Sequence, residues 1–586
     1  MIKYIYDDFL MGEYMKKIIA AILALSLAAG VFCGFSCGIN DGTDDGDDGE
    51  VIITPEPKPE DSLSAHQKIN LSADGYVRDG INDFSVYEGT SAYRKVTTAE
   101  ELLSAIADAT YHYKNVWDED TGTYTQVPAD GYTEENFEGA VRVIEIANDI
   151  NLGYNVLSAE AKATGLVSDF ASSANKLSPY LYMSDNFNEN GISQIKVERV
   201  SNLLIYSKNG AKLTHCGFKL SYDNNVVFRN LEFDEIWQWE DGTAEASKIG
   251  DYDWFGWAYF KIAFCGYIWI DHCTFGKSYD GQIDVSNPEY TANAQVAACA
   301  PYGADGSCAV HISWCKFNAG SEDEDGYIYQ TMQAIEEEYQ AHTDAEDGYV
   351  SKHAYYDALR DGGVTFEEIL YGIAIPQKKG FLCGDSGDDY KYNLKLQVSF
   401  ANCTFKNLED RIPKLRGGNA YMYNCVVDSS EYYAYRTRLR SKSAASLVSK
   451  INSSWKCGLV SQGIVCGNGG SVKAENCIFR GVENLLKNND SNSADKVIGG
   501  YELINCSYKL GANSTEIVGS SPDKTFPNSS AGTLKTEYFS WHTEDGLAPF
   551  IPSVTALNVL GEYLADVDYG AGAHTSFKLS LLKSKY

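Results

Sequence analysis

The stretch Ile268-Trp-Ile-Asp-His-Cys273-Thr-Phe decides the fold of this chain. Hydrophobic residues alternate with other residues along its first part, a cysteine follows, and a second short run of strand-forming residues comes after the cysteine. Five later segments share the pattern: Val310-His-Ile-Ser-Trp-Cys315-Lys-Phe, Val398-Ser-Phe-Ala-Asn-Cys403-Thr-Phe, Tyr421-Met-Tyr-Asn-Cys425-Val-Val, Val472-Lys-Ala-Glu-Asn-Cys477-Ile-Phe and Leu503-Ile-Asn-Cys506-Ser-Tyr. Two earlier segments are related to it: Leu213-Thr-His-Cys216-Gly-Phe and Val227-Phe-Arg-Asn-Leu231-Glu-Phe.

These segments recur at the variable intervals of a repeat architecture with insertions. Each unit reads as a strand, a bend and a second strand, which cannot bury its apolar face alone but can when units stack. The pattern therefore predicts an all-β fold, a parallel β-helix with the cysteines in an interior ladder. Cysteines on adjacent coils would be close enough for disulfides, so their oxidation state stays open. The alternative, a β-sandwich, is disfavoured because Asn-Gly and Asp-Gly hairpin signals are few.

The N-terminus resembles an export signal. Met15 is the expected true start, because Lys16-Lys17 gives a basic region and residues 18–32 an apolar one. Residues 1–37 are predicted to be a lipoprotein-type signal peptide that ends near Cys33 and Cys37, with simple secretion as the alternative. Residues 38–64 are predicted to be an acidic, flexible tether, and residues 65–586 the β-helix domain.

Two helical passages interrupt the repeat. Thr98-Ala-Glu-Glu101 resembles a capping box and predicts a helix that covers the first coil. Residues 322–372 break the pattern and are predicted to be a helical insertion suited to act as a lid. Its helical pieces are expected at Gln330–Tyr339, His353–Arg360 and Phe366–Leu370.

The formal net charge of −33 makes local basic clusters informative. Arg411-Ile-Pro-Lys-Leu-Arg416 places three cations within six residues, and Lys378-Lys379 lies upstream. On so acidic a chain, such clusters predict a dedicated anion site, and the net charge argues against nucleic-acid binding. The alternative is that both clusters are solvated surface turns.

Asp280 and Asp284 are the candidate metal ligands. Residues at even spacing along a strand face the same side, so both carboxylates can point toward one ion. Hard oxygen ligands suit calcium, which takes six to eight of them. The alternative is a pair of solvated carboxylates on a turn.

Several motifs resemble those of pectate lyase family 1, in family order. Trp269-Ile-Asp-His272 resembles the family's WIDH-type strand, and Asp280-Gly-Gln-Ile-Asp284 its DGxxD segment. The segment from Lys378 to Gly384 is similar to its HxK…LxG motif, with Gln377 in place of histidine, and Arg411–Gly417 to its RxPxxRxG signature. Asp568-Tyr-Gly-Ala-Gly572 resembles its usual C-terminal end, so the resemblance runs from about Val96 to Gly572.

The resemblance implies a right-handed parallel β-helix, a Ca²⁺-assisted pectate lyase and an acidic plant cell-wall polysaccharide as partner. It implies that Arg411 is the Brønsted base, that Lys379 and Arg416 hold the substrate carboxylate, and that Asp280 and Asp284 bind calcium. The implied reaction removes the C5 proton of a galacturonate and expels the C4 oxygen, so cations aimed at the carboxylate stabilise the transition state. Arg411 as a purely electrostatic anchor is the alternative, because arginine is normally fully protonated.

One departure from the family puts calcium in doubt. Ala258 stands where the family usually has a further aspartate ligand, and Asp251 or Asp253, on a shifted loop, is the alternative ligand. Family members that cut methylated pectin work without calcium and have aromatic clefts. The tryptophans at 237, 239, 254 and 257 would suit such a cleft or would be buried packing.

Two other function classes remain open. A galacturonan hydrolase would need clustered acid and base carboxylates, for which Asp388-Asp389 is the only tempting pair. A non-catalytic polysaccharide-binding β-helix would keep the repeat but should lose Lys379, Arg411 and Arg416, which are all present. We expect an exported monomer, at the cell surface or in the periplasm as a lipoprotein, or secreted.

Overall fold

The computed structural model describes residues 84–110, 113–121, 123–128, 140–170, 189–239, 256–287, 308–318, 323–342, 353–384, 392–442, 461–488, 498–528, 534, 556–565 and 570–575. By its contacts the chain divides into residues 1–58 and 59–586, and every described residue belongs to the second unit. The predicted signal peptide and tether lie outside the described residues. No helix among the described residues is long and apolar enough to cross a membrane.

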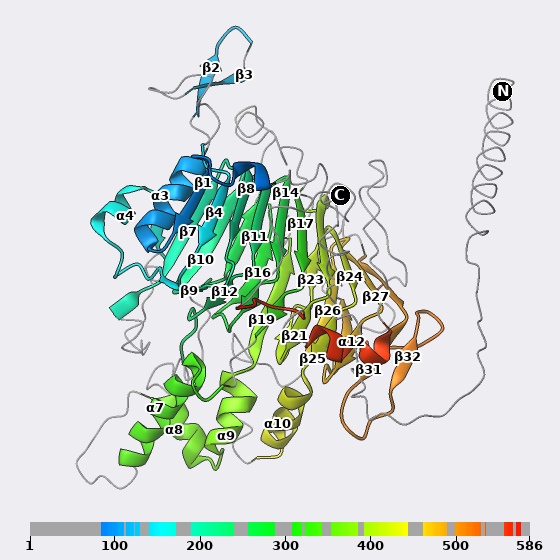
Figure 1. Cartoon of the computed structure of the whole chain (residues 1–586). Coiled ribbons are helices and arrows are strands. Elements are labelled where there is room, and N and C mark those ends of the chain that lie inside the picture. Colours follow the sequence, from blue (N-terminus) through cyan, green and yellow to red (C-terminus); the bar gives the residue numbers. More distant parts are fainter. Residues whose placement is uncertain are drawn as a thin grey trace, which may run out of the picture. The chain divides into compact units, whose positions relative to one another are not determined.

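The described strands form three long sheets wound into a right-handed parallel β-helix, as predicted (Figure 1). The first sheet contains, in spatial order, β1 (Tyr93–Val96), β4 (Val143–Ile146), β8 (Ser201–Tyr206), β11 (Asn224–Arg229), β14 (Tyr267–Asp271), β17 (Cys308–Ser313), β20 (Leu396–Ala401), β24 (Asn419–Tyr423), β27 (Ser471–Glu475) and β30 (Gly500–Ile504).

The second sheet carries the candidate site residues of the sequence analysis. It contains β29 (Asn484–Asn488), β26 (Gln462–Gly467), β23 (Lys414–Arg416), β19 (Gln377–Cys383), β16 (Gly281–Val285), β13 (Phe260–Ala263), β10 (Cys216–Ser221), β7 (Ser193–Glu198) and β6 (Val167–Asp169), with β22 (Leu408–Asp410) also paired to β19. Its pairings from β7 to β29 are parallel, and β6 is antiparallel to β7.

The third sheet closes each coil. It contains β32 (Ile517–Gly519), β31 (Cys506–Lys509), β28 (Ile478–Arg480), β25 (Val426–Asp428), β21 (Thr404–Lys406), β18 (Lys316–Phe317), β15 (Thr274–Phe275), β12 (Glu232–Asp234), β9 (Lys212–Thr214) and β5 (Ile150–Asn151). A coil therefore has three strands, not the two that the sequence pattern indicated. The pattern marked a first-sheet strand, the bend and a third-sheet strand, and missed the second sheet.

The predicted cysteine ladder runs along the corner between the first and third sheets. Its members are fully buried and free: Cys273, Cys315, Cys403, Cys425, Cys477 and Cys506. The residue before each cysteine has a positive φ, between 47° and 55°, which asparagine tolerates better than most residues. Cys216 departs from the prediction, because it begins β10 in the second sheet and so lies at a different corner.

The first coil is covered by α3 (Ala99–Ala109), as predicted. The Thr98 side chain accepts a bond from the Glu101 N–H, while the Glu101 carboxylate accepts from the Thr97 N–H, one residue before the position of a standard capping box. Leu102, Leu103 and Ile106 of α3 are fully buried in the main core. Short elements that complete this end are η2 (Phe84–Tyr87), α4 (Ala159–Ala163) and the hairpin of β2 (Tyr113–Asp118) and β3 (Thr123–Pro128).

The insertion between β18 and β19 has a core of its own. It contains α7 (Tyr327–His342), α8 (Ala354–Asp361), α9 (Phe366–Ile369) and η5 (Leu370–Ala374), so helical structure extends slightly beyond residue 372. Figure 1 shows these helices grouped beside α10 (Ser430–Arg440), and the rings of Tyr371 and Tyr435 stack at 5.3 Å. Because the insertion leads directly into β19, it lies next to the strand that carries Lys379. Its role as a lid stays a prediction.

The C-terminal segment returns to the middle of the helix. The helix α12 (Leu557–Leu564) packs its Leu560 and Leu564 against Trp314, and Gly572 N–H donates to the Trp314 carbonyl at 2.7 Å. The described part of the predicted C-terminal motif, residues 570–572, therefore covers the corner at the cysteine ladder.

Candidate active site

The five candidate residues lie on adjacent strands of the second sheet. Asp280 precedes β16 and Asp284 lies within it, Lys379 is in the neighbouring β19, Arg411 links β22 to β23, and Arg416 ends β23. Gly281 is in register with Lys379, and Lys379 with Asp410. Parallel pairing thus brings together carboxylates and cations that are far apart in the sequence.

Asp280 and Lys379 form an ion pair whose side chains are 18% and 13% exposed. Burial raises the pKa of Asp280, but the positive charges of Lys379 and Arg411 outweigh burial and leave that pKa below its ordinary value. Asp280 is therefore ionised, and one of its oxygens is engaged by Lys379.

Asp284 is in a different state. Burial, reinforced by the charge of Asp280, raises the pKa of Asp284 above its ordinary value, although Arg411 and Lys261 act in the opposite direction. Its Oδ1 is buried without a hydrogen-bond partner among the described residues. Gly281 leaves room for this oxygen, since a Cβ there would lie 2.9 Å from it. A buried acceptor left unsatisfied costs about 1–3 kcal/mol, so this oxygen indicates a ligand or cation that completes the site.

Arg411 is held in a strained conformation by the backbone around it. Its φ is 65°, in the left-handed region that non-glycine residues rarely adopt. Its carbonyl accepts from Phe381 N–H at 2.7 Å, and its own N–H donates to Asp410 Oδ1 at 2.7 Å. Gly380 permits this close approach, because a Cβ there would lie 2.6 Å from the Arg411 carbonyl oxygen. The Arg411 Nε is buried and makes no hydrogen bond to any described residue.

Gln377, the departure from the histidine of the HxK motif, fixes the start of β19. Its Nε2 donates to the carbonyls of Asp280 and Lys379 at 2.6 and 2.8 Å, and its Oε1 accepts from Ser278 N–H at 3.0 Å. One buried amide therefore ties together the backbones of both members of the ion pair. A neutral histidine has one donor and one acceptor, so glutamine makes more of these bonds at once.

The described residues do not by themselves form a complete calcium site. They contain no cluster of three or more histidine, cysteine, aspartate or glutamate side chains that could hold a metal. Ala258 is buried, Asp251 and Asp253 lie outside the described residues, and Lys261 stands in register beside Asp284. Asp280 and Asp284 fit a cation through the unsatisfied Asp284 oxygen, but a full calcium shell needs further oxygens from substrate, water or other residues.

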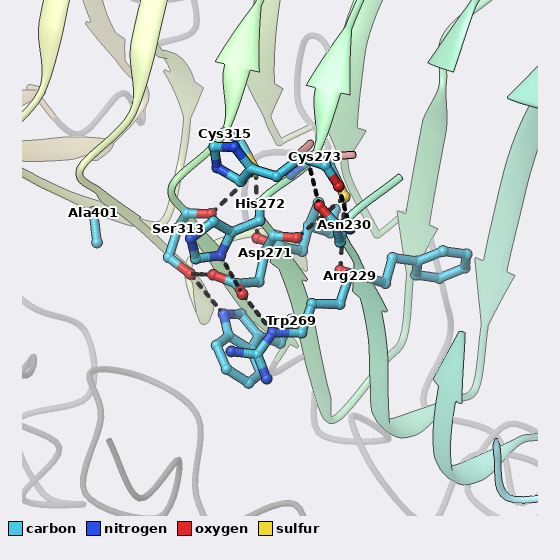
Figure 2. A network of polar contacts seen from close by, with 12 residues as sticks. Arg229, Asn230, Trp269, Asp271, His272, Cys273, Ser313, Cys315 and Ala401 are labelled. Atoms are coloured by element: carbon cyan, nitrogen blue, oxygen red, sulfur yellow. Dashed lines mark hydrogen bonds and ion pairs between the residues drawn. The ribbon is translucent and has the colours of Figure 1, made fainter. Parts of the chain in front are cut away.

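The WIDH motif lies at the end of β14 in the first sheet, and Figure 2 shows the polar network that its side chains form. Asp271 accepts from Arg229 Nε at 2.6 Å and from Ser313 Oγ at 2.5 Å, and its Oδ2 lies 2.7 Å from His272 Nδ1. Trp269 Nε1 donates to Ser313 Oγ at 2.8 Å. Burial raises the pKa of Asp271, but His272 and Arg229 outweigh it and hold that pKa well below the ordinary value. This buried network joins three coils and has a structural role.

The tryptophans expected in an aromatic cleft are packing residues where they are described. Trp237 and Trp239 are 4% and 3% exposed and belong to the core of the helical insertion, and Trp257 is fully buried in the main core. Trp254 lies outside the described residues, as do Asp388 and Asp389. The structure thus favours the packing alternative for these three tryptophans.

Sequence reasoning assigned no role to Lys414, although it lies inside the RxPxxR segment. It occupies β23 between Arg411 and Arg416, on the same sheet as the other candidates. The signal that could have found it is its spacing: two residues before Arg416 along a strand, it shares that residue's face.

Comparisons with known proteins agree with this arrangement. No protein-family model matches the sequence. The chain is 28% identical over 406 residues to pectate lyase B of Paenibacillus amylolyticus, covering 68% of this chain and 91% of that protein. It is 30% identical to a pectate trisaccharide-lyase of Thermotoga maritima over 124 residues, 21% of this chain and 26% of that protein.

A solved structure gives the same result for the fold. A pectate lyase from Paenibacillus sp. 0602 superposes with a TM-score of 0.65 and 25% identity, covering 88% of this chain and all of that one. Similarity to pectate lyases therefore extends over most of the chain. The chain belongs to the pectate lyase superfamily.

Proposed function

We propose that the protein is a pectate lyase that cleaves α-1,4-linked galacturonan by β-elimination and releases 4,5-unsaturated uronides. The observation that carries the proposal is the gathering of Lys379, Arg411 and Arg416 beside Asp280 and Asp284 on adjacent strands of one sheet. On a chain with a net charge of −33, this cationic cluster is suited to a uronate carboxylate. The sequence similarity to two pectate-cleaving enzymes supports the same reaction.

The reaction needs positive charge beside the substrate carboxylate, where negative charge develops in the transition state. Removal of the C5 proton leaves an electron pair that delocalises onto the C5 carboxylate and then forms the C4–C5 double bond, while the C4–O bond breaks toward the leaving sugar. Lys379 and Arg416 bind the carboxylate and stabilise the extra negative charge it gains, which lowers the barrier more than it strengthens ground-state binding.

Arg411 is the proposed catalytic residue that contacts the reacting carbons. Its Nε makes no hydrogen bond to any described residue, so this donor is not engaged by the described part of the protein. As a base it would take the C5 proton, and as a guanidinium it would stabilise the developing anion. The two roles predict different pH dependence, since arginine stays protonated through the ordinary pH range.

Asp280 and Asp284 are the proposed calcium ligands. An ion held there supplies positive charge that neutralises the substrate carboxylate and makes the C5 proton more acidic. Lys261 is in register with Asp284 and its positive charge acts on that carboxyl group, which favours a second candidate, a pectin lyase that needs no metal.

We further propose that the protein is exported and acts as a monomer on acidic plant cell-wall polysaccharide. The basic and apolar segment from Met15 to Phe32 supports export, and Cys37 with the acidic run that follows it supports a lipid anchor at the cell surface or in the periplasm. Simple secretion is the alternative.

The test is a near-ultraviolet absorbance assay on polygalacturonate and on methylated pectin, each with added Ca²⁺ and with a chelator. β-Elimination creates a double bond conjugated to the carboxyl group, so absorbance rises. We expect a chelator-sensitive rise on polygalacturonate that Arg411→Ala abolishes. A chelator-resistant rise that favours pectin would support the metal-free candidate. A flat trace on both polymers, with the polymers still bound, would replace the enzyme by a binding protein.

A further inference from the structure

A row of three lysines crosses the second sheet and leads to the candidate site. Lys196 of β7, Lys219 of β10 and Lys261 of β13 are in register with one another. Lys261 is in turn in register with Asp284 of β16. Neighbouring strands lie about 4.8 Å apart, so the backbone positions of Lys196 and Asp284 are separated by about 14 Å across the strands. We call Lys196, Lys219 and Lys261 the lysine row.

The lysine row lies on the outer face of the sheet. In each of the three strands, the residues just before and just after the lysine are buried in the main core. Because side chains alternate along a strand, the lysines point away from that core. Lys196 and Lys219 are exposed, and Lys261 is half-buried with its Nζ 5.3 Å from the centre of the Phe170 ring. The row therefore presents its charges on the same face as Asp284.

The charges of the lysine row are poorly compensated within the described part of the chain. The side chains of Lys196 and Lys219 make no ion pair or hydrogen bond with any described residue. Glu198 is the only acidic residue in the three strands that carry the row. Like charges that stand directly opposite each other on neighbouring strands repel. On a chain with a net charge of −33, such a row is a local surface for an anionic ligand.

Lysine side chains suit a polymer whose charges have no fixed spacing relative to the strands. Each ends in a compact charge on a flexible stem, so neighbouring lysines can adjust to successive carboxylates. Beyond Asp284 the same register continues through Leu382 to Lys414, which places a further cation on the other side of the site. A chain with one carboxylate on each sugar can therefore lie across the strands, with one sugar at the site and its neighbours over the row.

We propose that the lysine row binds free carboxylates of the galacturonan chain on one side of the cleavage point and selects long unesterified stretches of it; this rests on the proposed lyase function. A methyl ester removes the negative charge of a sugar, so an esterified stretch gains nothing from the row. The row lies strands away from the reacting sugar, so it strengthens binding of the polymer without changing bond cleavage. Salt screens such exposed charges, so the contribution of the row falls as ionic strength rises.

The test measures KM and kcat from the absorbance of the unsaturated product, using the full chain. The row variant carries Lys196→Gln and Lys219→Gln, and Lys261 is kept because its charge also acts on Asp284. On polygalacturonate we expect KM of the row variant to rise roughly 2- to 20-fold with little change in kcat, because each exposed ion pair contributes modestly. On trigalacturonate, which fills the site and leaves most of the row empty, the rise in KM should be much smaller.

Two matched variants separate the charge of the row from net charge and from folding. Lys509→Gln with Lys524→Gln removes the same number of charges from β31 and from the segment after β32, and should leave KM unchanged. Arginine at both positions 196 and 219 keeps the charge and should keep the wild-type KM. Circular dichroism of each variant verifies that it is folded.

Salt and esterification give two further readouts of the same row. Added salt should raise KM of the wild type more steeply than KM of the row variant. Two pectins of equal ester content, one with its free carboxylates in blocks and one with them scattered, test the selectivity. The wild type should have the higher kcat/KM on the blockwise pectin, and the row variant should lose most of that preference.

The outcomes distinguish the lysine row from the lyase function. If the row variant keeps the wild-type KM on polygalacturonate, or if its KM rises equally on trigalacturonate, the row does not hold the polymer and the proposal fails while the lyase function stands. If the wild type forms no unsaturated uronide, the proposed function fails, and electrophoresis through gels that contain polygalacturonate tests the row by itself. Stronger retardation of the wild type than of the row variant would support the row, and equal retardation would overturn it.

Discussion

Replacing Lys414 by methionine should make the protein more stable at neutral pH. The pKa of Lys414 falls from its ordinary 10.5 to about 8 because folding buries the ammonium among like charges. A difference of this size corresponds to roughly 3 kcal/mol that the folded protein loses by holding the protonated lysine. Because the side chain is half-buried and partly screened by solvent, we expect a gain of about 1–3 kcal/mol in Lys414→Met at neutral pH.

The sign of the pH dependence follows from the direction of the pKa change. Below about pH 8 both the folded and the unfolded protein carry the charged lysine, so the full penalty applies. Between that pH and 10.5 the folded protein releases the proton first, and the stability of the wild type rises. The advantage of the variant should therefore shrink across this interval and vanish above it.

Thermal unfolding followed by circular dichroism measures this effect. We expect the midpoint of Lys414→Met to exceed that of the wild type by a few degrees at about pH 6.5 and to match it at about pH 10.5. Lys219→Met, whose side chain is exposed, is the control and should match the wild type at both pH values. A variant that is less stable at the lower pH, or an advantage that is equal at both, would refute the electrostatic account of Lys414.

Three other changes test the remaining structure. Asp271→Asn should destabilise the protein by roughly 3–5 kcal/mol in denaturant titrations, because it leaves buried Arg229 without a counter-charge. It should also remove the part of acid unfolding that comes from protonating Asp271. A change below about 1 kcal/mol at neutral pH would show that the network contributes little to stability. Gly380→Ala should lower kcat/KM roughly 10²-fold by displacing the Arg411 carbonyl. Gly561→Ala is the control and should leave activity intact, because a Cβ there meets nothing within 4 Å. Equal activities of the two variants would contradict the close approach of Gly380 to Arg411. The eleven described cysteines are buried and form no disulfide with one another, so peptide mass spectrometry should find them unmodified by iodoacetamide until the protein is unfolded. Labelling of the native protein would contradict the interior ladder.

The β-helix was predictable because its signal is local and repeated. In six coils a cysteine follows the first-sheet strand. Because equivalent positions stack from coil to coil, the same sequence pattern recurs in each of these coils. The second sheet escaped the pattern because its strands are preceded by insertions of very different length, such as α7 to η5 before β19 and α10 before β26. The site lies on that sheet, so the repeat that revealed the fold did not reveal how the site is assembled.

The motifs named candidate residues that the fold brings onto adjacent strands, but they could not describe the environment of each residue. Nothing in the sequence separates Asp280, which pairs with Lys379, from Asp284, whose Oδ1 stays unsatisfied among the described residues. The sequence alone gave Lys414 no individual role, whereas strand register places it between Leu382 and Val465, among other cations. Such differences arise from burial and neighbours across strands, which sequence spacing does not contain.

The most direct test of the account is the mass of the products that the wild type forms from polygalacturonate. The account predicts that each cut leaves one end lighter by a molecule of water than the product of hydrolysis, and that Arg411→Ala forms none. Saturated products of full mass would contradict it and make the protein a hydrolase, and unchanged polymer would leave a binding protein on the same fold.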